Sequence, residues 1–511
     1  MMTITELQQR YAAHPNVEAM SGLLKNPSVR TLFCGGLCAS AASLFSSVLV
    51  QRGEFPFVFI LGDLEEAGYF YHDLTQVLGT DKVLFFPSSF RRAIKYGQKD
   101  AANEILRTEV LSRLQKGEEG LCVVTYPDAL AEKVVSRKEL GDKTLKLHSG
   151  ENVDTNFIME VLRSYGFEYV DYVYEPGQYA VRGSIIDVFS FSSEFPYRID
   201  FFGDEVESIR TFEVETQLSK EKKDSIVIVP DLSRSLEQGG ASGMVSFLDF
   251  LSADTVLAMR DLLWLRERIQ TVHDETLTPQ AIAAREAEES GCITLDGKLI
   301  DGSEFTLRAL DFRRMEFGNK PTGTPDATIT FDTSAQPIFR KNFDMVAESF
   351  KEYMEKGYAL YICSDSMKQT DRIRAIFEDR GDQIAFTAVE RTLHEGFADN
   401  ALRLCIFTDH QLFDRFHKYN LKSDKARSGK VALSLKELNQ FTPGDYVVHT
   451  DHGVGRFSGL VRIPNGDTTQ EVMKLVYQNE DVVFVSIHSL HKVSKYKGKD
   501  GEAVSYTHLT L

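Results

Sequence analysis

The chain has 511 residues, of which 42% are hydrophobic and 26% are charged. This composition excludes the fibrous and intrinsically disordered classes of protein, and the length predicts about three to five globular domains. The formal net charge of -17 at pH 7 argues against a broad, unspecific nucleic-acid surface, because such a surface needs clustered cations.

The six cysteines show no CxxC spacing, which indicates reduced thiols rather than disulfides or a metal centre. The N-terminus lacks the apolar core of a signal peptide, and no apolar run approaches the ~18 residues of a membrane span. We therefore expect a cytoplasmic protein, a monomer, with no metal site and no membrane partner.

An apolar strand over residues 31–34 runs into Gly35 and then into a helical pattern, which is the order of a phosphate-binding P-loop. A P-loop of the form GxxxxGK[ST] uses a second glycine, a lysine and a hydroxyl group to hold the phosphates and magnesium. Counting from Gly35, these places hold Ser40, Ala41 and Ala42. The sequence therefore predicts a degenerate P-loop, with no catalytic residues and no nucleotide cofactor in this chain.

Short apolar strands alternate with helical stretches over residues 1–132, which predicts a parallel sheet covered by helices. Residues 217–327 are expected to complete this sheet, with a helix over residues 255–270. Between them, residues 133–216 contain β-hairpin patterns and are expected to form an inserted α+β module, which we call the hairpin module. The predicted fold class is multidomain α/β.

Residues 328–420 again alternate helices and strands and predict a second small α/β domain. A polar linker is expected over residues 421–439, and residues 440–503 contain short strands and Gly-rich turns that predict a small all-β barrel. His449 and His452 in this stretch favour turn or surface roles, because no further metal ligands follow at a suitable spacing.

Alternation in the hairpin stretch "YRIDFF" separates a core face from an outer face. Arg198 and Phe202 fall on the outer face, and Arg182 is expected near them if "SIIDVF" is the neighbouring strand. Arginine beside an exposed aromatic ring is typical of a protein interface. The alternative is a plain surface in which Arg198 pairs with Asp200 or Glu205 and Phe202 packs beneath a loop.

Two stretches resemble a known family. Residues 177–213, "GQYAVRGSIIDVFSFSSEFPYRIDFFGDEVESIRTFE", resemble the module shared by the excision-repair protein UvrB and the bacterial transcription-repair coupling factor (Mfd). Residues 441–460, "FTPGDYVVHTDHGVGRFSGL", resemble the RNA-polymerase-interacting domain of that factor, which UvrB lacks. With the degenerate P-loop in front of them, these stretches make the chain similar to the coupling-factor family from about residue 20 to residue 503.

The resemblance implies a bacterial protein that recognises RNA polymerase stalled at DNA damage and recruits excision repair. It implies that the hairpin module binds UvrA, and that an edge strand of the small barrel pairs with the β subunit of RNA polymerase. The matching positions are Arg182, Arg198 and Phe202 for UvrA, and Leu460, Val461, Arg462 and Ile463 for the polymerase.

Family members continue into an ATP-dependent DNA translocase, to which ATP, Mg²⁺ and most contact with damaged DNA are assigned by the resemblance. We therefore expect this chain to be the recruitment and adaptor part, without catalysis. Residues 504–511 depart from the family pattern, which suggests a truncated or misassembled reading frame. Two alternatives are a UvrB-like ATP-dependent helicase and a DNA-binding transcription regulator that uses the lysines near the C-terminus.

Overall fold

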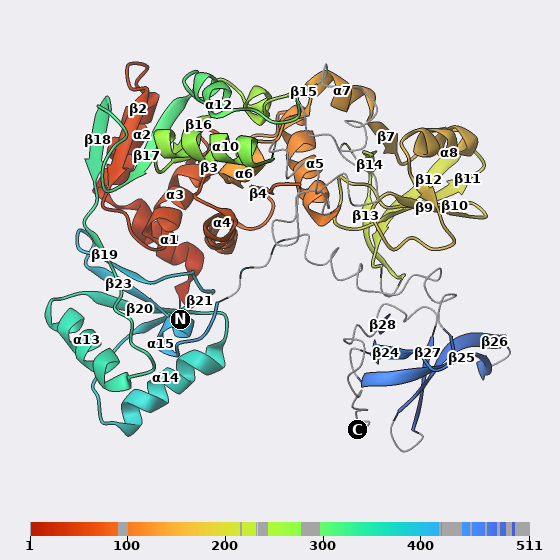
Figure 1. Cartoon of the computed structure of the whole chain (residues 1–511). Coiled ribbons are helices and arrows are strands. Elements are labelled where there is room, and N and C mark those ends of the chain that lie inside the picture. The colour runs from red at the N-terminus through yellow and green to blue at the C-terminus, as the bar shows by residue number, and fades with distance from the viewer. Residues whose placement is uncertain are drawn as a thin grey trace. The chain divides into compact units, whose positions relative to one another are not determined.

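The computed structural model describes residues 2–89, 101–214, 217–230, 232, 244–276, 297–417, 419, 421, 442–449, 452–465, 468–477, 481–486 and 493–495. The chain divides into two compact units, Met1–Asp142 with Leu232–Leu421 and Lys143–Asp231 with Lys422–Leu511. Figure 1 traces the chain through both. None of the described helices has both the length and the apolar character needed to cross a membrane.

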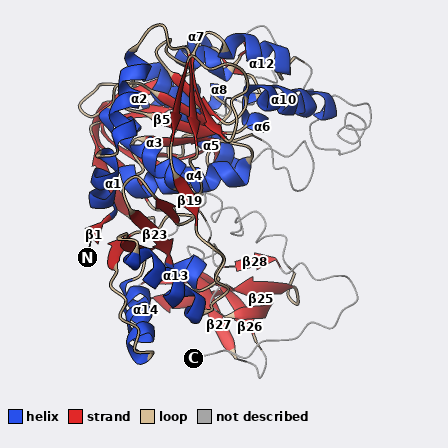
Figure 2. Ribbon diagram, turned by 90° about the vertical axis from the view of Figure 1, so that its left-hand side faces the viewer, coloured by secondary structure: helices blue, strands red, loops and turns tan. Residues whose placement is uncertain are grey.

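The first unit contains a seven-stranded sheet in which every pairing is parallel, in the order β18-β2-β17-β16-β3-β5-β4. Its strands are β2 (Thr31–Gly35), β3 (Phe57–Ile60), β4 (Val83–Phe86), β5 (Cys122–Thr125), β16 (Val256–Met259), β17 (Arg313–Gly318) and β18 (Ala327–Thr330). Most of its central strands are buried along their whole length, because helices lie on both sides of the sheet (Figure 2). Strands that precede and follow the hairpin module in the chain thus share one sheet.

The strands of this sheet alternate along the chain with most of the helices of the first unit. These helices are α2 (Pro15–Lys25), α3 (Ala41–Arg52), α4 (Leu64–Leu78), α5 (Ala101–Lys116), α6 (Pro127–Leu130), α7 (Arg137–Asp142), α10 (Leu262–Thr276) and α12 (Gly302–Ala309), with the 3-10 turn η2 (Phe247–Phe250). Two short strands, β6 (Val134–Val135) and β15 (Met244–Val245), form a separate pair.

The helix predicted over residues 255–270 is only partly right. Its first part, Val256–Met259, is the buried strand β16, which pairs with β3 and β17, and the helix α10 begins at Leu262. A short apolar run fits a buried strand and a helix equally well, and only the pairing partners decide between them.

A second, six-stranded sheet also belongs to the first unit, in the order β1-β21-β20-β23-β22-β19. Its elements are β1 (Met2–Thr3), β19 (Thr333–Ala335), β20 (Ala359–Ser364), β21 (Thr387–Glu390), β22 (Phe397–Asp399), β23 (Leu404–Thr408), and the helices α13 (Phe343–Glu355), α14 (Met367–Asp379) and α15 (Asp409–Leu412). The strands β1, β21, β20 and β23 pair in parallel, and β22 and β19 are antiparallel. The N-terminal strand therefore joins a sheet formed by residues more than 300 positions away.

The N-terminal helix α1 (Ile4–Ala12) follows β1 directly and packs between the two sheets of the first unit. A capping box formed by Thr3 and Glu6 fixes its start. The buried hydroxyl of Tyr11 donates to Asp399 Oδ2 at 2.8 Å, and Gln8 Nε2 donates to Ser47 Oγ at 3.1 Å. The helix α1 thus contacts α3, which lies beside the seven-stranded sheet, and β22, which is a strand of the six-stranded sheet.

The hairpin module is a six-stranded sheet in the order β13-β12-β11-β10-β9-β8. Its elements are β7 (Leu145–His148), α8 (Thr155–Ser164), β8 (Glu168–Tyr169), β9 (Gln178–Arg182), β10 (Ile185–Val188), β11 (Tyr197–Phe202), β12 (Glu205–Phe212), β13 (Ser219–Lys223) and β14 (Ser225–Ile228). One face of the sheet packs on α8 and the β7–β14 pair in a core that includes Ile186, Ile199 and Ile209. These strands continue past residue 216, where the sequence suggested an end.

The C-terminal sheet is antiparallel, in the order β27-β26-β25-β24-β28. Its strands are β24 (Tyr446–His449), β25 (Gly453–Asn465), β26 (Thr468–Val476), β27 (Val482–Ser486) and β28 (Val493–Lys495). A small core that includes Val447, Phe457 and Leu475 lies against it. The predicted class, multidomain α/β, is confirmed, with parallel sheets and a C-terminal antiparallel sheet. The finer prediction that the C-terminal part closes into a barrel stays a prediction.

Gly36, directly after β2, illustrates a backbone position that only glycine fits. It has a φ of +80°, and a Cβ there would lie 2.0 Å from the carbonyl oxygen of Phe331. We expect Gly36→Ala to lower the free energy of unfolding by more than about 2 kcal/mol, because it adds a clash with backbone to left-handed strain. Urea denaturation measures this.

The matched control is Gly53→Ala, at a left-handed position with a φ of +67° and nothing within 4 Å of the added Cβ. Strain alone is expected to cost about 1 kcal/mol there. Equal losses in the two variants would show that the contact with Phe331 contributes nothing.

Candidate functional site

The predicted P-loop positions lie together at the end of β2. Gly35 is the last residue of the strand, Ser40 is the N-cap of α3, and Ala41 and Ala42 form the first turn of that helix. Backbone groups of the loop are already used, because the N–H of Cys38 donates to Thr333 Oγ1 at 3.1 Å and Thr333 Oγ1 donates to the carbonyl of Gly36 at 2.6 Å. The loop therefore offers a phosphate neither a lysine nor a full ring of free amides.

A cavity of about 770 Å³ opens beside this loop, at the carboxyl ends of β2, β3, β16 and β17. Ligands of open α/β sheets bind at such ends. Its acidic lining consists of Asp63, Glu65, Glu66, Asp73, Asp261 and Glu395, and its cationic lining consists of Arg260 and Lys320. Arg260 is itself paired with Glu66. The surplus of carboxylates opposes a nucleoside triphosphate, which needs cations and amide donors.

Asp73 on α4 joins the loop to the second sheet of the first unit. Its Oδ2 accepts a hydrogen bond from Ser43 Oγ at 2.7 Å, and its Oδ1 accepts one from the N–H of His394 at 2.7 Å. The hydroxyl of Ser40 accepts from the N–H of Glu395 at 2.9 Å. Burial raises the pKa of Asp73 to about 6. Ser40 and Ser43, at the start of α3, thus make hydrogen bonds to α4 and to the segment at residues 394–395, rather than to a phosphate.

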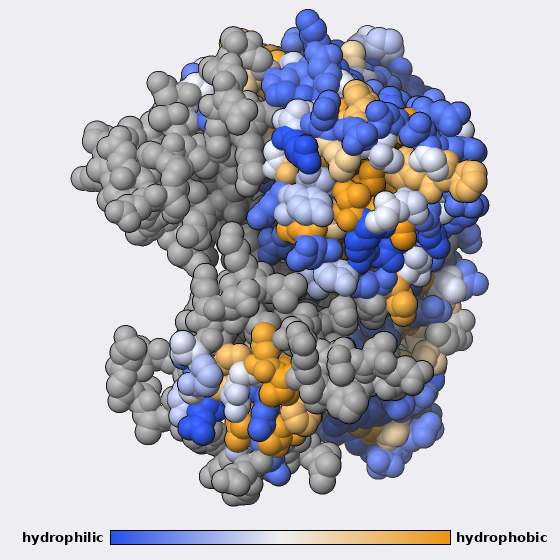
Figure 3. All heavy atoms as spheres, turned by 90° about the vertical axis from the view of Figure 1, so that its right-hand side faces the viewer, coloured by the Kyte–Doolittle hydropathy of each residue, from blue (hydrophilic) through white to orange (hydrophobic). Residues whose placement is uncertain are grey.

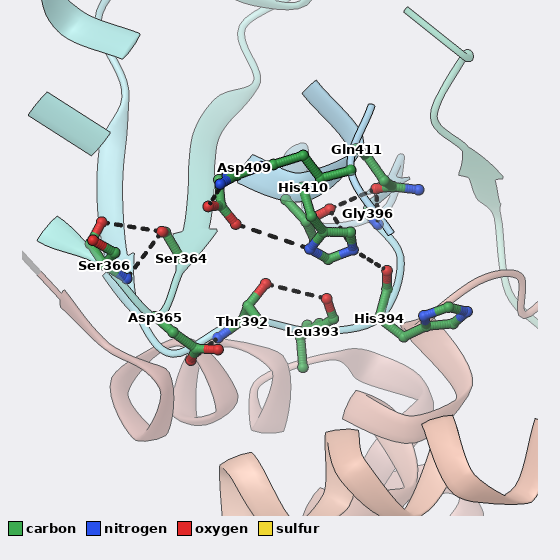
Figure 4. Close-up of polar contacts among 12 residues, drawn as sticks. Ser364, Asp365, Ser366, Thr392, Leu393, His394, Gly396, Asp409, His410 and Gln411 are labelled. Atoms are coloured by element: carbon green, nitrogen blue, oxygen red, sulfur yellow. Dashed lines mark hydrogen bonds and ion pairs between the residues drawn. The ribbon is translucent and has the colours of Figure 1, made fainter. Parts of the chain in front are cut away.

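Four histidines gather on the same side of α4, and Figure 4 shows two of them, with His410 Nε2 hydrogen-bonded to the carbonyl of His394 at 2.7 Å. The rings of His410 and His417 stack at 4.3 Å, and His394 stacks on Tyr69 at 3.5 Å. The fourth histidine is His72. Burial lowers the pKa of all four rings, to about 4 for His394 and about 3 for His417. Neutral rings packed in this way indicate a structural role, and among the described residues no cluster is arranged to hold a metal.

The outer face of the hairpin module brings two of the predicted UvrA-binding residues onto one carboxylate. Arg198 Nε and Nη2 donate to Asp187 Oδ1 and Oδ2 at 2.8 and 2.9 Å, and Arg182 Nη2 also donates to Oδ2. This hydrogen bonding to Asp187 raises the pKa of Arg198. Phe202, at the end of the same strand as Arg198, is 78% exposed.

The alternative pairing of Arg198 is wrong, because Asp200 pairs with Arg210 instead. The expectation that Phe202 packs beneath a loop is also wrong, given its exposure. Sequence reasoning missed Asp187 altogether. A signal existed, since a single carboxylate inside the apolar run "SIIDVF" requires a buried partner.

The strand predicted to bind RNA polymerase forms the second half of β25. Its residues pair with β26, from Leu460 opposite Met473 to Ile463 opposite Gln470, whereas β24 pairs only with residues 453–456. Among the described strands, this half of β25 therefore has a partner on one side only. Leu460 is 37% exposed and Val461 is half-buried. The side chains of Arg462 and Ile463 lie outside the described residues.

Apolar side chains reach the surface on the faces of the hairpin module and of the C-terminal sheet that Figure 3 displays. In the C-terminal sheet the exposed apolar residues include Leu460, Val482 and Phe484. The lysines that a DNA-binding regulator would use cannot be placed, because Lys492, Lys497 and Lys499 and the side chain of Lys495 lie outside the described residues.

Comparison with known proteins finds matches to the hairpin module and to the C-terminal sheet. The UvrB interaction domain matches residues 145–233, and the CarD-like/TRCF RID domain matches residues 441–497. The transcription-repair-coupling factor of Bacillus subtilis (strain 168) is 22% identical over 539 residues, which cover 91% of this chain and 45% of the relative. That of Staphylococcus aureus (strain bovine RF122 / ET3-1) is 23% identical over 528 residues, which cover 90% and 45%.

The chain thus spans less than half the length of these relatives, while the similarity includes 90% or more of its own residues. The two matched domains occur in the order in which the sequence analysis expected them. The chain is therefore similar, over 90% or more of its length, to the bacterial transcription-repair-coupling factors, and it contains segments that match the UvrB interaction domain and the CarD-like/TRCF RID domain.

Proposed function

We propose that this chain is the recruitment and adaptor part of a transcription-repair coupling factor. In this role it links RNA polymerase stalled at DNA damage to nucleotide-excision repair, through UvrA and the polymerase β subunit, in the bacterial cytoplasm and as a monomer. The observation that carries the proposal is the outer face of the hairpin module, where Arg182 and Arg198 share Asp187, and where Phe202, on the same strand as Arg198, is exposed.

The chemistry of that face fits a protein partner. An aromatic ring that is 78% exposed is costly in water and favourable in a partner's apolar pocket. Arg182, whose side chain is 34% exposed, can supply charge-assisted hydrogen bonds to carboxylates of a partner. A partner with an apolar pocket next to acidic residues would satisfy both, and we assign this surface to UvrA.

The C-terminal sheet supports the polymerase contact in a different way. The half of β25 over residues 460–463 has described pairing only with β26, so its other side can accept a strand from a partner. We assign this strand, Leu460, Val461, Arg462 and Ile463, to the β subunit of RNA polymerase.

The same proposal assigns no catalysis and no cofactor to this chain. The acidic cavity beside the degenerate loop and the occupied backbone groups of the loop count against the helicase alternative. The transcription-regulator alternative depends on lysines outside the described residues, and the net charge of -17 does not favour it. Direct contact with damaged DNA is assigned to the translocase motor of the family.

The purified chain is expected to show no saturable binding of ATP with Mg²⁺ up to millimolar concentration. The loop lacks the lysine that reaches the β and γ phosphates, and the cavity repels negative charge. Isothermal titration calorimetry measures this, with an intact P-loop ATPase as positive control. Magnesium-dependent saturation would favour the helicase alternative.

Phe202→Ala and Arg182→Ala are each expected to weaken binding of UvrA by about 1 to 4 kcal/mol, because both truncate groups that reach the surface. Calorimetry on the full chain measures the loss. The matched control is Phe157→Ala, which removes another half-exposed ring of the same module, on α8, and is expected to leave the affinity unchanged. If neither test variant differs from the control, the assigned face is wrong.

Replacing Arg462 in β25 tests the strand-pairing contact. Proline occurs in strands where its nitrogen faces away from a neighbour, so Pro464 indicates that the N–H two residues earlier also faces the free side. Arg462→Pro is expected to weaken binding to the polymerase β subunit about threefold to tenfold, the worth of one hydrogen bond. Arg462→Ala is the control, because it removes the same side chain and keeps the N–H. Equal binding by both variants in a surface plasmon resonance titration would exclude main-chain pairing at this residue.

A further inference from the structure

A row of polar residues crosses the outer face of the hairpin module, in register on three neighbouring strands. Asp187 of β10 lies opposite Arg198 of β11, which lies opposite Arg210 of β12. Asp187 is fully buried although it lies on this face. It is flanked by a small apolar cluster that includes Phe189 and Phe212. A carboxylate in this position is withdrawn from water and must be matched by donors.

Arg198 supplies most of those donors and has little left to offer a partner. Its Nε and Nη2 hold both oxygens of Asp187, its Nη1 donates to the carbonyl of Gln217 at 3.0 Å, and its guanidinium lies 4.4 Å from the ring centre of Phe212. Its side chain is only 14% exposed. The guanidinium group of Arg198 therefore makes its hydrogen bonds within the hairpin module.

Arg182 is placed differently. Asp187 Oδ2 is the one hydrogen-bond acceptor that the described residues give it, and its guanidinium lies 4.9 Å from the ring centre of Tyr172. Its side chain is 34% exposed. One edge of the guanidinium is thus held by the buried carboxylate and one face lies over a ring, and no other acceptor among the described residues takes its remaining donors.

We propose that Asp187 is a positioning residue, which presets the Arg182 guanidinium for an acidic patch on UvrA, and that Arg198 acts through Asp187 rather than on the partner directly. The proposal rests on the proposed function of this face. A long arginine side chain loses rotamer freedom when it docks, and a carboxylate that holds it beforehand removes part of that cost.

The direction in which one substitution changes the affinity for UvrA separates a positioning role from a purely electrostatic one. Asp187→Asn removes a negative charge and makes the face more positive. If charge alone mattered, an acidic partner would bind this variant faster and more tightly. If Asp187 positions Arg182, the variant binds more weakly despite its extra positive charge.

The experiment uses the full chain and purified UvrA, with affinity and association rate measured by surface plasmon resonance at low and high salt. Asp187→Asn is expected to bind about threefold to tenfold more weakly. In the Arg182→Ala background the same substitution is expected to have no further effect, because the residue being positioned is gone. Equal or tighter binding by Asp187→Asn, or losses that add in the double variant, would overturn the positioning role.

Two further variants keep the result interpretable. Asp200→Asn removes a carboxylate of the same strand region that pairs with Arg210 and hydrogen-bonds neither Arg182 nor Arg198, and it is expected to bind normally. Arg198→Lys keeps the charge pair, and so the fold, but cannot hold both oxygens of Asp187. It is expected to weaken binding and to show the same non-additivity with Arg182→Ala.

Thermal unfolding of each variant accompanies the binding data. If Asp187→Asn fails to fold, Arg198→Lys decides: normal binding by that variant overturns the proposal. If Phe202→Ala and Arg182→Ala weaken binding while Asp187→Asn and Arg198→Lys do not, the positioning role is wrong and the docking face stands. Absence of UvrA binding by the unaltered chain overturns the proposed function and the positioning role together.

Discussion

A carboxylate removed from water must be matched by hydrogen-bond donors, and three buried aspartates meet this requirement where separate helices, strands and loops come together. Asp399 accepts the hydroxyl of Tyr11 from the N-terminal helix. Asp73 accepts a backbone N–H from the loop that follows β21. Asp187 accepts two arginines from the strands on either side of it. Because an unpaired buried charge costs several kcal/mol, each carboxylate fixes the arrangement of the elements around it.

Packing within the first unit accounts for the backbone of the loop after β2, which the sequence predicts to be a degenerate P-loop. Gly36 retains a left-handed conformation because the backbone at Phe331 leaves no room for a side chain, a reason that does not involve phosphate. Ser40, in the place of the second P-loop glycine, accepts a hydrogen bond from the segment at residue 395. The same region therefore contributes to the packing of the first unit, a role that needs neither the lysine nor the hydroxyl group of a P-loop.

Much of the outer face of the hairpin module could be predicted from alternation. Period two placed Ile199 in the core and Phe202 at the surface, and the structure has them fully buried and 78% exposed. The partner of Arg198 could not be predicted in this way. Nearby carboxylates in the sequence were plausible partners, but Asp187 lies opposite it on the adjacent strand, and the register between strands is a tertiary property.

The sequence by itself determined most of the alternation of helices and strands, the absence of lysine and hydroxyl from the two P-loop positions at Ala41 and Ala42, and the face on which Arg198 and Phe202 lie. These follow from residue type and from spacing within one element. Only the tertiary structure decided that Met2–Thr3 completes a sheet built from residues 333–408, that Val256–Met259 is a strand, and that two arginines share Asp187. Each of these depends on contacts between different elements of the chain. No pattern within one element encodes them, because strand pairing and the matching of a buried charge are set by the groups that folding brings together.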